Sequence, residues 1–389
     1  MKRVNKFKDH SQIVKIEIRE AVMKKKHLLA VVLIMAIIFV GLGGINKVGT
    51  AAMLTYSFDD GHISVYSEAF SILENYGQVG TANVISNAVL NANQGWSQKG
   101  MNSIQLIEMQ NAGWEICSHS KTHPHFSKIP QTYNDEFLND WTSVSGASYT
   151  YQTNYFYQEL PFVLEGEITL KRRSSVEEVE ATLGSYYFDA SSNQVYVHKT
   201  DNSDPSFNEM RADSVQRELE MSKSELTEMG LDIQNFIVPY SDWSENRREL
   251  AIEYYNSVGA GYHDGWVNDI PPDDLYWLAR FYIRGTETTI DDVKALISET
   301  IDEDGWLILM LHSIGEPPEG CGWPDGYWPE EDLIDLADWV STQDIQVVTQ
   351  QQGLAAVPIP PSFILLLSGL PIILGDRSLQ KRILHKLIN

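Results

Sequence analysis

The chain has 389 residues, of which 43% are hydrophobic, and its net charge at pH 7 is −24. This length and composition suit a globular protein with one large α/β domain or two smaller ones. Residues 1–50 carry ten Lys/Arg against three acids and residues 376–389 carry four against one, which leaves −34 on residues 51–375. Such an acidic body excludes nucleic-acid binding by counterion release and suits a soluble surface protein with a neutral or cationic partner.

The first 50 residues are predicted to be an export signal. Lysines at 24–26 precede an apolar run at 28–40, and glycines follow it. This order is typical of a secretory signal peptide, and a run that extends to Ile45 would also serve as an uncleaved anchor. We therefore expect residues 1–50 to be a signal peptide or an N-terminal membrane anchor, and the body to be exported to the cell surface or beyond.

Strands and helices alternate through most of the body. Strands are expected at 53–58, 82–85, 114–118, 235–238, 259–262, 306–311 and 346–348. Helices are expected at 64–76, 104–112, 214–229, 245–257, 290–303 and 330–341. Seven strands that alternate with helices predict an α/β fold with a parallel sheet closed as a barrel. In parallel barrels the chemistry gathers at the carboxyl ends of the strands.

The alternation is interrupted between residues 131 and 211, a stretch rich in Tyr, Thr, Ser and Val. Residues 184–206 alternate in hydrophobicity on both sides of Ala190-Ser191-Ser192-Asn193, which predicts a β-hairpin. The run LPFVLEGEITLKRR, residues 160–173, predicts one or two further strands. We therefore expect a β-rich module inserted into the barrel.

Two carboxylates stand side by side at the end of the first strand, in Ser57-Phe58-Asp59-Asp60-Gly61. Adjacent like charges repel, so both side chains ionise only if positive groups lie nearby. At a strand end of a parallel barrel, the pair lies where a site is expected.

Polar side chains follow three other strands. His119 ends the strand at 114–118 and His123 comes four residues later, a spacing that lets two imidazoles bind one ion. His312 follows the apolar strand at 306–311. Pro239 restrains the backbone before Tyr240, and a rigid turn there would aim a backbone N–H at a reacting oxygen.

These strand-end segments, in this order along the chain, resemble the motifs of the polysaccharide deacetylase family, carbohydrate esterase family 4. The family motifs correspond here to Ser57-Phe58-Asp59-Asp60-Gly61, His119-Ser120-Lys121-Thr122-His123, Ile237-Val238-Pro239-Tyr240, His263-Asp264-Gly265-Trp266 and Met310-Leu311-His312. The resemblance implies a distorted (β/α)7 barrel at 51–130 and 212–356, with the β-rich insert at 131–211. It also implies a divalent metal, usually zinc, on Asp60, His119 and His123.

The resemblance implies roles for the other side chains as well. Asp59 would be the general base that takes a proton from the attacking water, and His312 the general acid that protonates the leaving amine. The backbone N–H of Tyr240 would hold the oxyanion together with the metal. Asp264 is the expected partner that tunes His312, and Asp242 is the alternative.

The third motif departs from the family pattern, because Ile237 stands where the family has the arginine that orients the base. Few basic residues are available in the acidic body. Arg280 follows an apolar run that is expected to lead toward the strand ends. It is therefore the expected substitute partner of Asp59, and Arg284 is the second choice.

The C-terminus resembles the PEP-CTERM sorting signals of bacterial surface proteins, in their Val-Pro-x-Pro variant. Residues 357–361 are proline-rich, residues 362–374 are mostly apolar, and the tail that follows is basic. The resemblance implies that residues 357–389 associate with the membrane and meet a sorting protease; a plain membrane tail is the alternative. Outside the cytosol, Cys117 and Cys321 could form a disulfide.

The expected function is metal-dependent removal of N-acetyl, or else O-acetyl, groups from an extracellular polysaccharide. The alternative is a catalytically weak or inactive glycan-binding surface protein that keeps the metal site, which the arginine missing at Ile237 and the aromatic-rich insert favour. A pure binder has no need of Asp59 and His312 together, which favours the enzyme. A metal-dependent phosphoesterase would need more ligands and basic groups. Chitin, peptidoglycan, poly-N-acetylglucosamine and mixed exopolysaccharides are open as substrates.

Overall fold

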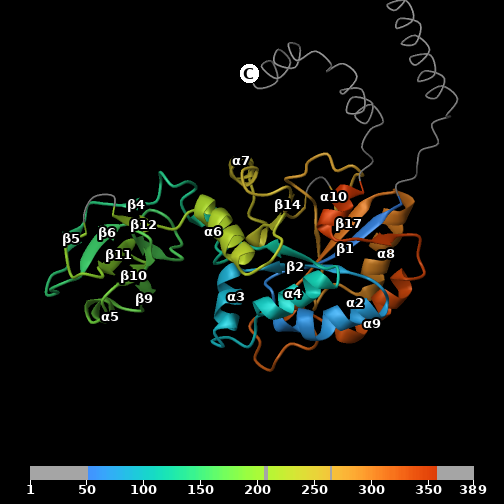
Figure 1. Cartoon of the computed structure of the whole chain (residues 1–389), viewed down its shortest axis with the longest axis horizontal. Coiled ribbons are helices and arrows are strands. Elements are labelled where there is room, and N and C mark those ends of the chain that lie inside the picture. The colour runs from blue at the N-terminus through green and yellow to red at the C-terminus, as the bar shows by residue number, and fades with distance from the viewer. Residues whose placement is uncertain (1–50, 206–208, 263–264, 357–389) are drawn as a thin grey trace, which may run out of the picture. The chain divides into compact units, whose positions relative to one another are not determined.

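A computed structural model describes residues 51–205, 209–262 and 265–356 (Figure 1). The predicted signals at 1–50 and 357–389, and the predicted His312 partner Asp264, lie outside the described residues. Among the described helices, none has the length and apolar character needed to cross a bilayer.

The centre of the fold is a nine-stranded sheet that curls back on itself. Its parallel neighbours are β1 (Met53–Phe58), β2 (Gly80–Val84), β3 (Glu115–Ser118), β13 (Phe236–Ile237), β14 (Val258–Gly259), β16 (Phe281–Tyr282) and β17 (Trp306–Leu311). β17 pairs with both β1 and β16, and a parallel bridge between Gly259 and Leu278 links β14 to the segment that leads into β16. Outside this ring, β15 (Val267–Asn268) pairs antiparallel with β17 and β20 (Gln346–Val347) pairs parallel with β1. The predicted distorted (β/α)7 barrel is confirmed.

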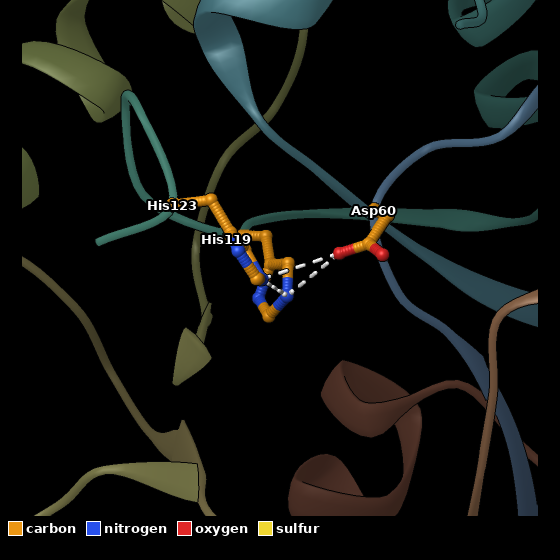
Figure 2. Close-up of side chains that lie close together, drawn as sticks. All are labelled: Asp60, His119 and His123. Carbon is orange, nitrogen blue, oxygen red and sulfur yellow. Dashed lines mark hydrogen bonds and ion pairs between the residues drawn. The ribbon is translucent and has the colours of Figure 1, made fainter. Parts of the chain in front are cut away.

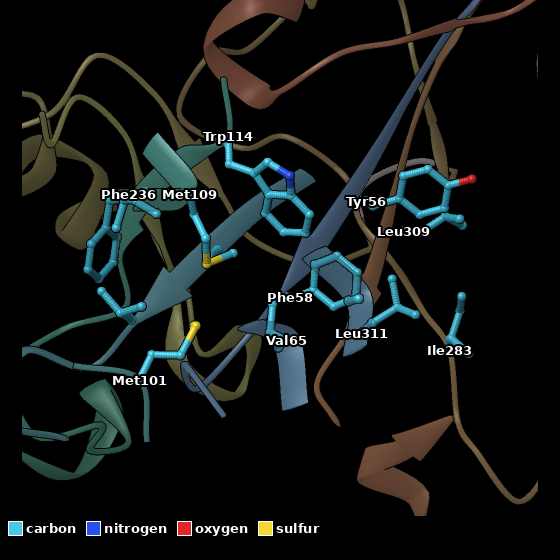
Figure 3. Packing of buried hydrophobic residues seen from close by; sticks show 14 of the residues in the cluster. Tyr56, Phe58, Val65, Met101, Met109, Trp114, Phe236, Ile283, Leu309 and Leu311 are labelled. Carbon is cyan, nitrogen blue, oxygen red and sulfur yellow. The ribbon is translucent and has the colours of Figure 1, made fainter. Parts of the chain in front are cut away.

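The barrel depends on the pairing of β1 with β17. Their registers run from Met53 opposite Trp306 to Phe58 opposite Leu311, and every residue of both strands is buried. Strands buried on both faces are typical of parallel sheets covered by helices. Phe58 stacks on Trp114 with ring centroids 5.7 Å apart (Figure 3). Truncating a buried aromatic of this kind costs about 3–5 kcal/mol.

Helices cover this sheet. They are α2 (Phe70–Asn75), α3 (Ser86–Asn93), α4 (Ser103–Asn111), α6 (Val215–Glu228), α7 (Glu245–Ala251), α8 (Ile290–Asp302), α9 (Glu330–Val340) and α10 (Gln350–Ala355). A π-helical turn, Val65–Ala69, leads directly into α2, so the helix expected at 64–76 forms in two pieces. α2 packs beside α9, and α3 beside α4 (Figure 1). Capping boxes at Asn102 and Thr289 satisfy the first backbone N–H groups of α4 and α8.

The insert forms two small sheets with a hydrophobic core of their own. One contains β5 (Thr142–Ser143), β6 (Tyr151–Asn154), β9 (Lys171–Arg172), β10 (Ser185–Asp189) and β11 (Gln194–His198). The other contains β4 (Phe137–Leu138), β7 (Val163–Glu165), β8 (Ile168–Thr169) and β12 (Met210–Ala212). The predicted hairpin is β10–β11, and the short helix α5 (Val176–Glu180) was not predicted. Cys117 and Cys321 are free, so the disulfide is absent.

Candidate active site

The polar side chains picked out from the sequence converge at the carboxyl ends of the parallel strands. Asp59 and Asp60 follow β1, His119 follows β3 and His312 follows β17. A pocket of about 640 Å³ lies over these strand ends. Its lining includes Asp59, Asp60, His119, His123, Tyr240, Arg280, Tyr282, His312 and Trp323.

Asp60, His119 and His123 form a three-residue cluster (Figure 2). Oδ1 of Asp60 lies 3.4 Å from Nε2 of His119 and 3.3 Å from Nε2 of His123, and the two nitrogens are 3.1 Å apart. Ligands held at 2.0–2.1 Å from one tetrahedral ion are about 3.3 Å from one another, so the three donor atoms fit a zinc-like ion. Oδ1 of Asp60 is buried and has no hydrogen-bond partner among the described residues.

The backbone around this cluster orients the ligand atoms. Nδ1 of His119 lies 2.9 Å from the carbonyl oxygen of Ile237, which can only accept, so Nδ1 carries the proton and Nε2 keeps its lone pair. His123 lies in a tight loop, with φ 61°, and its backbone N–H donates to Oγ of Ser120. Asp60 also has a left-handed φ, of 68°. Left-handed residues other than glycine cluster at functional sites, where packing holds them.

The electrostatics of the cluster suit a bound cation. Burial lowers the pKa of His123 to about 4, helped by neighbouring His119, so its ring is neutral near pH 7 as a ligand must be. Burial would raise the pKa of Asp60, but the adjacent His119, with His123, holds it well below its usual range. Burial would lower the pKa of His119, but Asp59 and Asp60 raise it. The two carboxylates therefore stabilise positive charge at this point.

Asp59 is held by Arg280. Nη1 of Arg280 donates to Oδ1 of Asp59 at 2.8 Å and to Oδ2 at 3.1 Å, and Nη2 donates to Oδ2 at 3.1 Å. Arg280 is fully buried and Asp59 is 2% exposed. Nδ2 of Asn83 donates a further hydrogen bond to Asp59, at 2.7 Å. Burial alone would raise the pKa of Asp59, but the Arg280 guanidinium and His119 lower it below its usual range.

Room for Arg280 comes from a glycine. A Cβ on Gly259 would lie 3.0 Å from Cδ of Arg280 and 2.5 Å from Cδ1 of Ile237. Ile237, which stands at the family's arginine position, is buried. Arg284, the second choice for this role, is instead half-exposed and pairs with Glu287 on the surface.

His312 lines the same pocket and lies between aromatic rings. Its ring lies edge-on to Trp323, with centroids 4.6 Å apart, and to Tyr282, at 5.3 Å. Its Nδ1 is buried without a hydrogen-bond partner among the described residues, and burial lowers the pKa of the ring. Asp242, the alternative partner for His312, is bound instead to Nη1 of Arg247, at 2.6 Å.

Tyr240 reaches the pocket rim from the turn after β13. Its φ is 56°, and its side chain is 57% exposed. The ring stacks on His125 with centroids 3.8 Å apart and planes 15° apart, and meets His123 edge-on at 4.5 Å. Sequence reasoning missed two contributors, Asn83 and His125. An amide side chain inside a strand that is buried throughout, β2, was the available signal for Asn83, whereas nothing in the sequence pairs His125 with Tyr240.

Comparisons with known proteins agree with the motifs. The sequence model of the polysaccharide deacetylase family matches residues 46–157. A search of curated protein sequences found no match. Among solved structures, the peptidoglycan deacetylase PdaC from Bacillus subtilis is 13% identical, covering 79% of this chain and 92% of that one, with a TM-score of 0.36. A family 4 carbohydrate esterase from Streptomyces lividans is 10% identical, covering 78% and 95%, with a TM-score of 0.38.

The two structural likenesses are too distant to carry a conclusion about this chain. The family-model match is direct, and it spans the residues that form the Asp60–His119–His123 cluster and the buried base candidate Asp59. The resemblance found in the motifs is confirmed over residues 46–157, which match the model of the polysaccharide deacetylase family, a class of hydrolases.

Proposed function

We propose that the protein is an exported, metal-dependent deacetylase that hydrolyses N-acetyl groups on an extracellular polysaccharide. The observation that carries this proposal is that one pocket is lined by the Asp60–His119–His123 cluster, by the Arg280-bound Asp59 and by His312. The terminal segments support export and membrane association, because they have the order of a signal peptide and of a sorting signal.

Asp60, His119 and His123 would hold one divalent ion, for which zinc fits the donor set best. Such an ion supplies Lewis acidity, which polarises the acetyl carbonyl and makes water more acidic. Asp59 takes the proton of the attacking water, and Arg280 and Asn83 hold its carboxylate in line for that transfer. The backbone N–H of Tyr240 stabilises the oxyanion.

His312 completes the reaction by donating a proton to the leaving amine nitrogen as the C–N bond breaks. Water thus supplies the oxygen of the acetate and, through Asp59 and His312, a proton for the amine. The chain therefore releases acetate and leaves an amino sugar in the glycan.

The competing proposal of an inactive glycan binder depended on the missing arginine of the third motif and on the aromatic-rich insert. Arg280 pairs with Asp59 from another segment, and a buried pair of this kind supports the role of a held base over binding alone. The test is acetate release from a panel of acetylated glycans by the full chain, with and without a chelator. Release that a chelator stops supports the enzyme, and no release from any glycan overturns it in favour of the binder.

A further inference from the structure

A second hollow, of about 280 Å³, adjoins the catalytic pocket on the side of the insert. His123 lines both the pocket and this hollow. One wall is the loop of Thr122 to Pro124 that carries the metal-ligand candidate, and the other comes from the insert, including Arg172 and Phe188. We call this hollow the insert groove. A glycan chain whose acetylated sugar lies at the cluster would extend past His123 into it.

Direct contacts fix the insert wall against the catalytic loop. Oε2 of Glu159 accepts a hydrogen bond from the backbone N–H of His125 at 2.9 Å, and Oε1 pairs with Nζ of Lys128 at 3.1 Å. The backbone N–H groups of Gln158 and Glu159 both donate to the carbonyl of Lys128. The insert wall is therefore bound to the loop that bears His123, and the charge of Glu159, which also lines the groove, is neutralised by Lys128.

Arg172 supplies an uncommitted positive charge to the groove. On β9 it lies opposite Tyr186 of β10 in parallel register, so it lies on the same face as Tyr186 and Phe188. Its side chain is exposed, and its guanidinium has no carboxylate within ion-pair distance among the described residues. Beside it, the half-buried Pro161 and the buried Pro124 and Phe188 line the hollow.

We infer that the insert groove binds a carboxylate-bearing sugar next to the acetylated one, so that the substrate is an acidic polysaccharide. This inference rests on the proposed deacetylase function. A guanidinium matches a carboxylate with two parallel hydrogen bonds. The body carries −34 over residues 51–375 and repels an anionic polymer, so an acidic substrate needs a local cation of this kind, whereas a neutral glycan does not. A single carboxylate charge also matches Arg172, the one Lys or Arg among the described residues that line the groove.

The binding test uses two hexamers with the same β-1,4-linked backbone: cellohexaose and its uronate form, in which each C6 is a carboxylate. Neither carries an acetyl group, so binding by the full chain is measured whether or not it deacetylates anything. We expect the uronate to bind about tenfold more tightly than cellohexaose, as for one charge-assisted pair near water. Arg172→Met should remove this preference.

Lys171→Met is the matched control, because it removes the same charge from the same strand but on the opposite face. It should keep the preference, and melting curves should show that both variants fold. The proposed role of the groove is overturned if the wild type does not prefer the uronate to cellohexaose, or if both variants lose this preference equally. With acetylated probes, Arg172→Met should raise KM about tenfold for a hyaluronan hexasaccharide, leave kcat unchanged, and leave chitohexaose unaffected. Uronate binding that needs Arg172 without any acetate release supports the groove and refutes the deacetylase instead.

Discussion

Replacing Arg280 with methionine removes the guanidinium that holds Asp59 and leaves His119, whose Nε2 lies 3.9 Å from Oδ2 of Asp59, as its remaining basic neighbour. Methionine keeps most of the apolar length of the side chain, so the change is mainly the loss of three charge-assisted contacts of 2.8–3.1 Å. Because both partners are buried, Asp59 loses its bidentate cationic partner, and breaking such a pair destabilises a protein by about 3–5 kcal/mol. Asn83 still holds one oxygen.

Arg280→Met should also slow catalysis. A base displaced by about 1 Å can lose about 100-fold in rate, so kcat should fall by about that factor. Arg280 holds the pKa of Asp59 down against burial, so Arg280→Met should move the acid limb of the pH–rate profile to higher pH. The Asp59–Arg280 pair also makes the stability of the fold depend on pH. It stabilises the folded wild type at pH values above the usual pKa of aspartate, and this contribution is lost as the pH falls and Asp59 takes up a proton.

The assay is acetate release across a pH series, with bound metal and melting temperature measured on the same samples. Metal content should not change, because Arg280 contacts Asp59 and the Ala260 carbonyl rather than the three ligand residues. Arg284→Met is the matched control, since Arg284 is half-exposed and pairs with Glu287, and it should leave kcat and the profile unchanged. Wild-type kcat and an unmoved acid limb in Arg280→Met would refute the role given to the pair.

Three further changes separate the other roles. His119→Ala should lose the bound ion, as elemental analysis of purified protein will show; equal occupancy in wild type and variant would contradict the ligand assignment. Asp59→Asn should keep the ion and lose turnover. A variant that retains most of its kcat would show that Asp59 is not the base and would make His312 the candidate for that role. His125→Ala should lower kcat by up to about tenfold, because a stacked ring pair is worth about 0.5–1.5 kcal/mol in holding Tyr240, whereas His125→Phe should restore it; equal losses would show that stacking is not what matters.

The barrel and most of its site were predictable because each depends on local signals. Buried parallel strands appear in sequence as apolar runs, and Asp59, Asp60, His119 and His312 directly follow such runs, so the fold brings them together. Arg280 could be named because the acidic body offers few cations. Its approach to Asp59, however, depends on the space beside Gly259, which no pattern reveals.

Other features could not be predicted, because tertiary packing decided them. The helix expected at 245–257 ends at Ala251, and the chain then turns and buries Tyr255 beside Phe236. α3 and α10 were missed, and the π-helical turn before α2 has no sequence signature distinct from an α-helix. The stacking of His125 on Tyr240 joins residues far apart in the chain, and only the fold could show it.

The central claim is that one ion held by Asp60, His119 and His123 is required for deacetylation. The most direct test is to strip the full chain of metal and measure acetate release while zinc is titrated back. Activity should rise from zero and level off at one equivalent per chain, and Asp60→Asn should recover little, because Oδ1 of Asp60 is the oxygen donor of the cluster. Full activity in the stripped protein, or full recovery by Asp60→Asn, would contradict the account.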